Sequence, residues 1–206
     1  MNFELTILGS NSAVPLINRH PTSQFLTIAD RHFLIDCGEG TQIRLRENGI
    51  GFGRIDRILI SHLHGDHFFG LIPLLSTLSL LDRKKAIHIY APKGLEQLVR
   101  DQLKVSSSWL KYPLIFHVLE TKKKAVVFED TKVIISSFPL SHTIECWGFE
   151  FKEKQRHRKI KKSFIESNKV PITEIKAIKE GADWTNADNV VFKNTDITLF
   201  AGKPFS

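Results

Sequence analysis

Cysteine is scarce in this sequence, which contains two cysteines among 206 residues. Cys37 and Cys146 lie far apart in the chain, so they do not form the closely spaced set that characterises small disulfide-stabilised secreted domains. We therefore expect both thiols to be reduced, which favours a cytoplasmic protein over a secreted one.

Long apolar runs are also missing. No stretch approaches the roughly 20 apolar residues that a membrane-spanning helix requires, and Met1–Glu4 carry no basic leader, so we expect neither a membrane segment nor a targeting signal. Internal repeats and low-complexity linkers are absent as well. Hydrophobic residues make up 42% and charged residues 25% of the chain, which is ordinary for a globular protein with one domain, or with one domain and an appendage.

Histidine, in contrast, is concentrated in the short stretch Ser61–His67. His62, His64, Asp66 and His67 place three imidazoles and a carboxylate within six positions. The apolar residues before this stretch predict a buried strand and those after it a helix, so the cluster is expected at a strand-to-helix turn. Imidazole nitrogens and carboxylate oxygens are ligands of catalytic zinc. Unrelated surface or core histidines, the alternative interpretation, would not account for four ligand-type residues at this spacing.

Another histidine occupies a similar setting further along the chain. Residues 133–138 have the pattern of a strand, and His142 follows its end. A metal site assembled from several strand ends requires such a residue, so His142 is a further candidate ligand, with an exposed loop histidine as the alternative. His88 alternates within a predicted strand and is interpreted as structural, whereas His117 and His157 stay unassigned.

Positive charge is unevenly distributed along the chain. The net charge is +7, and residues 152–162 contain seven basic residues and one acid, Glu153, so this segment alone carries +6. The basic residues are Lys152, Lys154, Arg156, Arg158, Lys159, Lys161 and Lys162. A basic arm on a nearly neutral body suggests a polyanionic partner, with a solvated charged loop as the alternative.

The apolar periodicity predicts a chain of mixed α and β structure. Thr41 is expected to cap the first helix, and Pro92 to lie near the start of the third. The predicted strands cover 3–7, 24–29, 32–36, 56–60, 87–91, 115–119, 126–128, 133–138, 146–151, 190–192 and 197–200. The predicted helices cover 41–48, 71–81, 92–103 and 171–180.

The order of these motifs resembles that of a known family. The stretch from His62 to His67 resembles the His-x-His-x-Asp-His motif of hydrolases with the metallo-β-lactamase fold. Leu8–Ser10, Pro15 with Asn18 and Arg19, and Asp36–Gln42 precede it, and Ser141 and His142 follow it. In this order the motifs resemble the short form of ribonuclease Z, the tRNA 3′-processing endonuclease. The string Asp36–Gln42 separates this group from lactamases and glyoxalases.

The resemblance implies an α/β (α+β) fold, a metallo-β-lactamase-like αββα sandwich whose C-terminal part is missing here. It implies zinc as the cofactor, with two ions in the complete enzyme. His62, His64 and His142 resemble the ligands of one ion, and Asp66 and His67 those of the other. Asp66 would also orient or deprotonate the attacking water. Asp36 corresponds to an aspartate that holds the metal ligands through hydrogen bonds.

The same resemblance implies a zinc-dependent endoribonuclease that removes the 3′ trailer from precursor tRNA. It favours a homodimer in which the arm of one subunit serves the site of the other. We expect residues 1–151 to form the core, 152–187 to form the basic arm as a tRNA-binding exosite, and 188–206 to begin the second half of the core, which is incomplete.

The chain departs from the family pattern after its basic arm. The family needs an aspartate that bridges both metals and a further histidine, and both lie C-terminal to the matched positions. No histidine follows His157, and Asp183, Asp188 and Asp196 do not stand at strand ends. We therefore expect a truncated chain that does not cleave efficiently with two metals.

Two other functions stay open. One is a small-molecule phosphodiesterase or esterase on the same fold, which would have no use for the basic arm. The other is a non-catalytic RNA-binding subunit, which would bind RNA without stoichiometric zinc.

Overall fold

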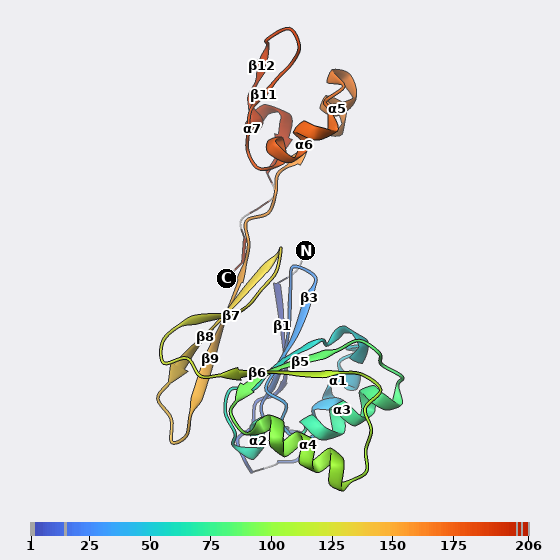
Figure 1. Cartoon of the computed structure of the whole chain (residues 1–206), viewed down its shortest axis with the longest axis vertical. Helices are drawn as coiled ribbons and strands as arrows, with labels where there is room; N and C mark the ends of the chain where they lie inside the picture. Colours follow the sequence, from blue (N-terminus) through green and yellow to red (C-terminus); the bar gives the residue numbers. More distant parts are fainter. Residues whose placement is uncertain (1–2, 15, 201, 203, 206) are drawn as a thin grey trace. The chain divides into compact units, whose positions relative to one another are not determined.

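The computed structural model describes residues 3–14, 16–200, 202 and 204–205. The chain divides into two compact units, Met1–Lys152 and Glu153–Ser206 (Figure 1). Within the described residues, no helix combines the length and the apolar character needed to cross a membrane.

A six-stranded sheet forms the centre of the first unit. Its strands follow one another in chain order. The first two neighbouring pairs are antiparallel, and the other three pairs are parallel. A tight turn with positive φ at Ala29 and Asp30 joins the second and third strands, as two-residue hairpins require. The strands are β1 (Phe3–Gly9), β2 (Ser23–Ile28), β3 (Arg31–Ile35), β4 (Arg57–Leu59), β5 (Ile87–Pro92) and β6 (Leu114–Leu119).

Three helices connect the parallel strands and cover one face of this sheet (Figure 1). They are α1 (Thr41–Glu47), α3 (Leu71–Leu80) and α4 (Leu95–Val105), and the short elements η1 (Phe52–Arg54) and α2 (Gly65–Phe68) lie between them in sequence. Each connection steps to the next strand in the same direction. Because such crossovers are right-handed, all three helices lie on the same face and leave the other free.

The second face of the sheet packs against a smaller sheet of three strands, in the order β7 (Ala125–Glu129), β8 (Val133–Leu140) and β9 (Cys146–Glu153). Successive residues of the central strands therefore face different cores. Leu34 and Ile58 contribute to the core beneath the helices, whereas Phe33 and Leu59 pack with Ile135 of β8 between the two sheets. The unit is a helix–sheet–sheet stack, and the predicted mixed α/β class is confirmed.

Three local predictions were wrong in detail. Gly40 with φ 79°, not Thr41, is the N-cap of α1, because a left-handed residue is needed there; the Thr41 hydroxyl instead donates to Gly38 O at 2.6 Å. Pro92 ends β5, and α4 begins at Leu95 after Gly94. Leu81, expected on the buried face of a helix, follows α3 and is exposed.

The second unit has a small core of its own, formed by Val170, Ile178, Trp184 and Ile197. The rings of Phe164 and Phe192 pack on Trp184 with centroids 5.6 Å away in both cases. Its elements are β10 (Lys159–Ile160), α5 (Lys162–Asn168), α6 (Ile172–Lys179), β11 (Trp184–Thr185), β12 (Val191–Phe192), α7 (Asn194–Ile197) and β13 (Thr198–Leu199). Residues 188–206, for which the sequence predicts the start of another core half, contribute β12, α7 and β13 here.

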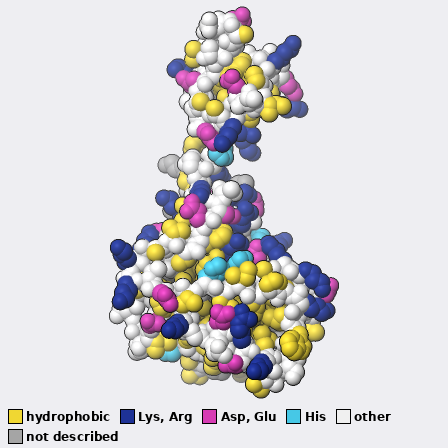
Figure 2. Space-filling view, in the orientation of Figure 1, with side chains coloured by type: hydrophobic (Ala, Val, Ile, Leu, Met, Phe, Trp, Pro, Cys, Tyr) yellow, Lys and Arg dark blue, Asp and Glu magenta, His cyan; other side chains and the backbone are white. Residues whose placement is uncertain are grey.

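Several cations of the basic arm are engaged within the second unit. Arg156 donates two hydrogen bonds to Glu153, at 2.6 and 2.8 Å. The Arg158 Nε bonds to Thr198 Oγ1 at 2.6 Å, and Lys161 Nζ bonds to a backbone carbonyl. Lys159 and Lys162 are exposed. Figure 2 shows Lys and Arg side chains interspersed with acidic and apolar ones on the face it displays.

Candidate metal centre

The histidine stretch lies at the carboxyl end of β4, where the chain leaves the sheet and enters α2. The backbone N–H of Ile60 still bonds to Tyr90 O of β5 at 2.8 Å, so the sheet holds the chain up to this point. On the other side, the N–H of Trp147 in β9 bonds to Ser61 O at 3.0 Å. Both sheets therefore fix the loop that carries His62 and His64.

Three imidazoles converge in front of this loop. His62 is buried, His64 is half-buried and His142, from the connection between β8 and β9, is exposed; each has a ring nitrogen within 4.8 Å of the others. The shortest separation joins His142 Nε2 and His64 Nδ1 at 3.3 Å. The ring centroid of His62 lies 4.9 Å from that of His64 and 4.7 Å from that of His142.

This spacing suits a tetrahedral cation. Two nitrogens at 2.0–2.1 Å from zinc and at a tetrahedral angle stand about 3.4 Å apart, close to the separation between His64 and His142. His62 Nδ1 lies 2.9 Å from Ser61 Oγ. Because the Ser61 hydroxyl donates to Asp36, the His62 ring donates its Nδ1–H to Ser61 Oγ, which leaves the lone pair on Nε2 for a metal. The residues present therefore fit zinc with three imidazole ligands and an open position.

His67 and Asp66 lie beside this group on α2. The ring of His67 is 3.9 Å from that of His62 between centroids, and its Nε2 is 3.6 Å from Asp66 Oδ2. Its Nδ1 contacts Asp36 Oδ2 at 2.7 Å. The structure thus brings together all five residues that the sequence singled out as candidate ligands, with Asp36 directly behind them.

Asp36 is the centre of a hydrogen-bond network behind the histidines. Its carboxylate, 6% exposed, accepts bonds from Ser61 N at 2.7 Å, Ser61 Oγ at 2.9 Å and His67 Nδ1 at 2.7 Å. Its backbone has φ 55°, in the left-handed region that aspartate tolerates better than most residues. The network holds this conformation and fixes the orientation of the His67 ring.

Two backbone hydrogen bonds of Cys37 hold the chain next to Asp36 against α2 and the start of α3. Cys37 N donates to His67 O at 2.7 Å, and Gly70 N donates to Cys37 O at 2.9 Å. The two loops approach so closely that a Cβ on Gly70 would stand 2.0 Å from Gly38 O. A glycine is therefore required at Gly70 by space rather than by its φ.

Charge and burial set the protonation of the buried His62 ring and the half-buried His67 ring. Burial, followed by the neighbouring His67, lowers the pKa of His62 to about 4, so this ring is neutral at pH 7 and keeps a lone pair for a metal. Burial also opposes protonation of His67, but the hydrogen bond and charge of Asp36 outweigh it and raise the pKa of His67.

Sequence reasoning missed Ser61 and Cys146. The Ser61 hydroxyl bonds to Asp36 and His62 and lies 3.3 Å from His67 Nδ1, and Cys146 Sγ lies 3.8 Å from His62 Nδ1. The position of Ser61 directly before His62 was a usable signal, whereas nothing in the sequence places Cys146 here.

A pocket of about 490 Å³ opens beside His64 and Asp66. Ala13, Pro21 and Phe69 supply its apolar walls, and Glu39 adds a carboxylate. Phe69 is 64% exposed, so its ring is free to contact a bound molecule. The arrangement can hold an organic group next to the candidate metal ligands.

Comparison with known proteins gives a consistent result. Residues 3–154 match the family described as Anti-Pycsar protein Apyc1. The chain is 44% identical over 202 residues to the ribonuclease Z of Bacteroides fragilis, which covers 98% of this chain and 66% of that protein. It is 37% identical over 203 residues to the ribonuclease Z of Parabacteroides distasonis, which covers 98% of this chain and 67% of that protein.

The solved structures agree. Human tRNase Z, short form, is similar with a TM-score of 0.69 and 34% identity, over 74% of this chain and 66% of that one. The metallo-β-lactamase fold protein YhfI from Bacillus subtilis, at 18% identity, has a TM-score of 0.57 over 80% of this chain and 67% of that one. The fold implied by the sequence motifs is confirmed. The chain spans about two thirds of the length of the curated relatives that it matches.

Proposed function

The chain belongs to the ribonuclease Z family, with a core that also belongs to the Anti-Pycsar protein Apyc1 family, and we propose that it carries the metal-binding part of an endoribonuclease that removes the 3′ trailer from precursor tRNA. This chain spans about two thirds of the length of these relatives. The cleavage activity is therefore proposed for the whole protein and not for this chain alone. The convergence of His62, His64 and His142 beside the network of Asp36 carries the proposal.

In this proposal His62, His64 and His142 hold one zinc ion. Asp66 and His67 contribute to a second, and further ligands belong to the whole protein. Zinc, when bound, supplies an acid that activates water at neutral pH and offsets the negative charge of the phosphodiester. Asp36 orients His67 through the 2.7 Å contact between its Oδ2 and Nδ1, as carboxylates behind metal-binding histidines commonly do.

Asp66 is the candidate catalytic residue. Its carboxylate lies on α2 at the edge of the pocket that His64 also lines, so it can orient the attacking water and take up its proton. If a phosphodiester lay in that pocket, a water beside the histidines could attack its phosphorus atom. Phe69 and Pro21 would then contact the adjoining nucleoside.

The basic arm is proposed to bind the tRNA backbone. Lys152, Lys159 and Lys162 are exposed and suited to phosphate contacts, whereas Arg156, Arg158 and Lys161 also have partners within their own unit. Lys154 is the seventh basic residue of the arm and belongs to the same proposed RNA-binding set. Recognition would rest on phosphate and shape rather than on base sequence. A homodimer and a cytoplasmic location belong to the same proposal.

Zinc content and cleavage together test the proposal. The chain should bind zinc stoichiometrically, His64→Ala and His142→Ala should each lose most of it, and His157→Ala, a histidine change in the second unit, should retain it. Asp66→Ala in a protein of the relatives' full length should abolish cleavage of precursor tRNA while RNA binding survives. Full zinc binding by both His64→Ala and His142→Ala would refute the assignment of the centre.

A small-molecule phosphodiesterase is the second candidate, favoured by the 490 Å³ pocket beside His64, which is of the size that holds small organic ligands. The basic arm separates the two functions. Neutralising Lys159 and Lys162 should weaken RNA binding and reduce its salt dependence if tRNA is the substrate. It should change nothing for an enzyme that acts on a small diester.

A further inference from the structure

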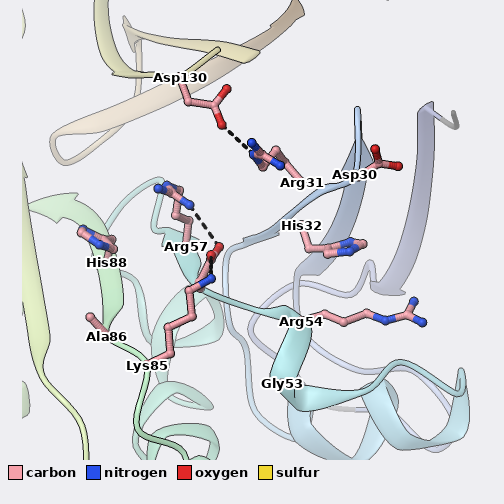
Figure 3. Close-up of a pocket in the computed structure, with 11 residues that line it drawn as sticks. Asp30, Arg31, His32, Gly53, Arg54, Arg57, Lys85, Ala86, His88 and Asp130 are labelled. Atoms are coloured by element: carbon pink, nitrogen blue, oxygen red, sulfur yellow. Dashed lines mark hydrogen bonds and ion pairs between the residues drawn. The ribbon is translucent and has the colours of Figure 1, made fainter. Parts of the chain in front are cut away.

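A second pocket lies at the opposite edge of the central sheet from the histidines. It has a volume of about 480 Å³ and is lined by residues that precede or begin β3, β4 and β5, together with Asp130 from the turn after β7 (Figure 3). The metal-centre residues follow the other ends of these strands. From Arg57 to His62 the chain advances five residues, or roughly 16 Å of strand. The pocket is therefore separate from the metal centre.

Four cationic side chains line this pocket. Arg31 and Arg57 are half-buried in its floor, and Arg54 and Lys85 are exposed at its rim. Figure 3 shows Arg31 directed at Asp130. Arg57 and Lys85 both pair with the carboxylate of Asp56.

The carboxylates of the pocket are already paired. Asp130 accepts Arg31 Nε at 2.6 Å and two backbone N–H groups, Asp56 accepts Arg57 at 3.1 Å and Lys85 at 2.5 Å, and Asp30 accepts Lys132 at 2.9 Å. The four lining cations and Lys132 outnumber these three carboxylates by two. A ligand that neutralised the pocket would carry two negative charges.

Several donors of the pocket have no partner in the part of the chain that the structure describes. The guanidinium of Arg54 forms no ion pair there, and Arg57 Nε is buried without a hydrogen bond. Arg31 uses only Nε for Asp130, which leaves its two Nη groups. Unused guanidinium donors with an excess of positive charge are the chemistry that binds phosphate.

We propose that this pocket binds a phosphate monoester of about mononucleotide size, with the guanidinium of Arg54 and the free Nη groups of Arg31 as donors to the phosphate and Lys85 as a further cation. A monoester carries close to two negative charges at pH 7, which matches the excess. The volume lies within the range of pockets that hold small organic ligands, so it accommodates more than an inorganic ion. The inference does not depend on the proposed ribonuclease activity.

Calorimetric titration of the metal-free 206-residue chain tests the proposal, with adenosine 5′-monophosphate, inorganic phosphate and adenosine as probes. The monophosphate should bind at one site and more tightly than phosphate, and adenosine should bind least. Arg54→Gln should weaken binding at least about ten-fold, because it removes charged hydrogen bonds. Arg54 is exposed, so the fold should tolerate the change.

Two controls separate this site from other cationic surfaces. Lys84→Gln removes the same charge from a lysine that is paired with Asp82 and does not line the pocket, and it should leave the affinity within about two-fold. His64→Ala should also leave it unchanged. Binding that survives Arg54→Gln, or that is lost in His64→Ala, would overturn the proposal. Equal affinity for phosphate or adenosine and the monophosphate would overturn the organic monoester as ligand.

Discussion

Replacing Asp36 with asparagine should weaken both the fold and the metal site. The substitution keeps the size of the side chain and its tolerance of φ 55°, but it removes the charge that accepts bonds from Ser61 and His67. One side-chain oxygen then remains for three donors. A buried hydrogen bond to a charged group contributes about 1.5–3 kcal/mol, so we expect a loss of about 2–4 kcal/mol in the free energy of unfolding.

The metal site should respond as well, because Asp36 holds the His67 ring by the 2.7 Å contact. Changes in the groups that orient metal ligands typically lower metal affinity about 10–100-fold. Urea unfolding of the metal-free chain measures the first effect, and competition with a chelator measures the second. Unfolding must be measured without zinc, because bound zinc itself stabilises the folded state and would mix the two effects.

Asp82→Asn is the matched control. Asp82 also has a left-handed backbone, with φ 60°, but its side chain is 64% exposed and pairs with Lys84 and Lys111 at the surface. Its replacement should leave stability and zinc affinity close to those of the parent chain. If Asp36→Asn behaved like this control in both assays, the network would not support the centre, and the reasoning would be refuted.

Three further changes probe other parts of the molecule. Gly70→Ala should cost at least ~2 kcal/mol in thermal or urea unfolding, because its Cβ would meet Gly38 O at 2.0 Å; Gly51→Ala, whose Cβ meets nothing within 4 Å, should be nearly neutral, and equal effects would contradict the packing argument. Burial opposes ionisation of Asp130, but Arg31 and two backbone N–H groups hold its pKa below the usual 3.8. The ionised form therefore stabilises the fold above that pH and loses this effect as the pH falls below it, so Asp130→Asn should cost about 1 kcal/mol at pH 7 and progressively less below pH 4. A difference that stayed constant across that range would show that the charge of Asp130 is not coupled to stability, and would contradict this argument. Trp184→Ala should remove about 3–5 kcal/mol of packing from the second unit, seen as faster amide exchange in residues 153–206 with residues 1–152 protected as before, and unchanged exchange in the second unit would argue against this core.

Local pattern was enough to predict much of the first unit. The apolar residues around Ile58 predicted β4, and the leucines from Leu71 to Leu78 predicted the buried face of α3. Both signals depend on the repeat of a single element, which the sequence displays directly. The spacing from His62 to His67 is local in the same sense, because ligands a few residues apart on one loop need little help from the rest of the chain.

Distant partners were beyond reach of such patterns. The sequence placed His142 at a strand end, but its approach to His64 at 3.3 Å depends on how β8 packs over the central sheet. Cys146 of β9 gained its contact with His62 through the same packing, and Ser61 reaches Asp36 because β3 and β4 are neighbours in the sheet.

Charge was the property that sequence described least well. The seven basic residues predicted a basic arm for a polyanionic partner, but folding turned Arg156 and Arg158 toward partners of their own unit. Conversely, Arg31, Arg54 and Lys85 are scattered in sequence and line one pocket. Sequence by itself determined which elements and ligand types this protein has, because short-range periodicity and spacing encode them. Only the tertiary structure decided which charges and imidazoles meet, because strands far apart in sequence become neighbours through packing.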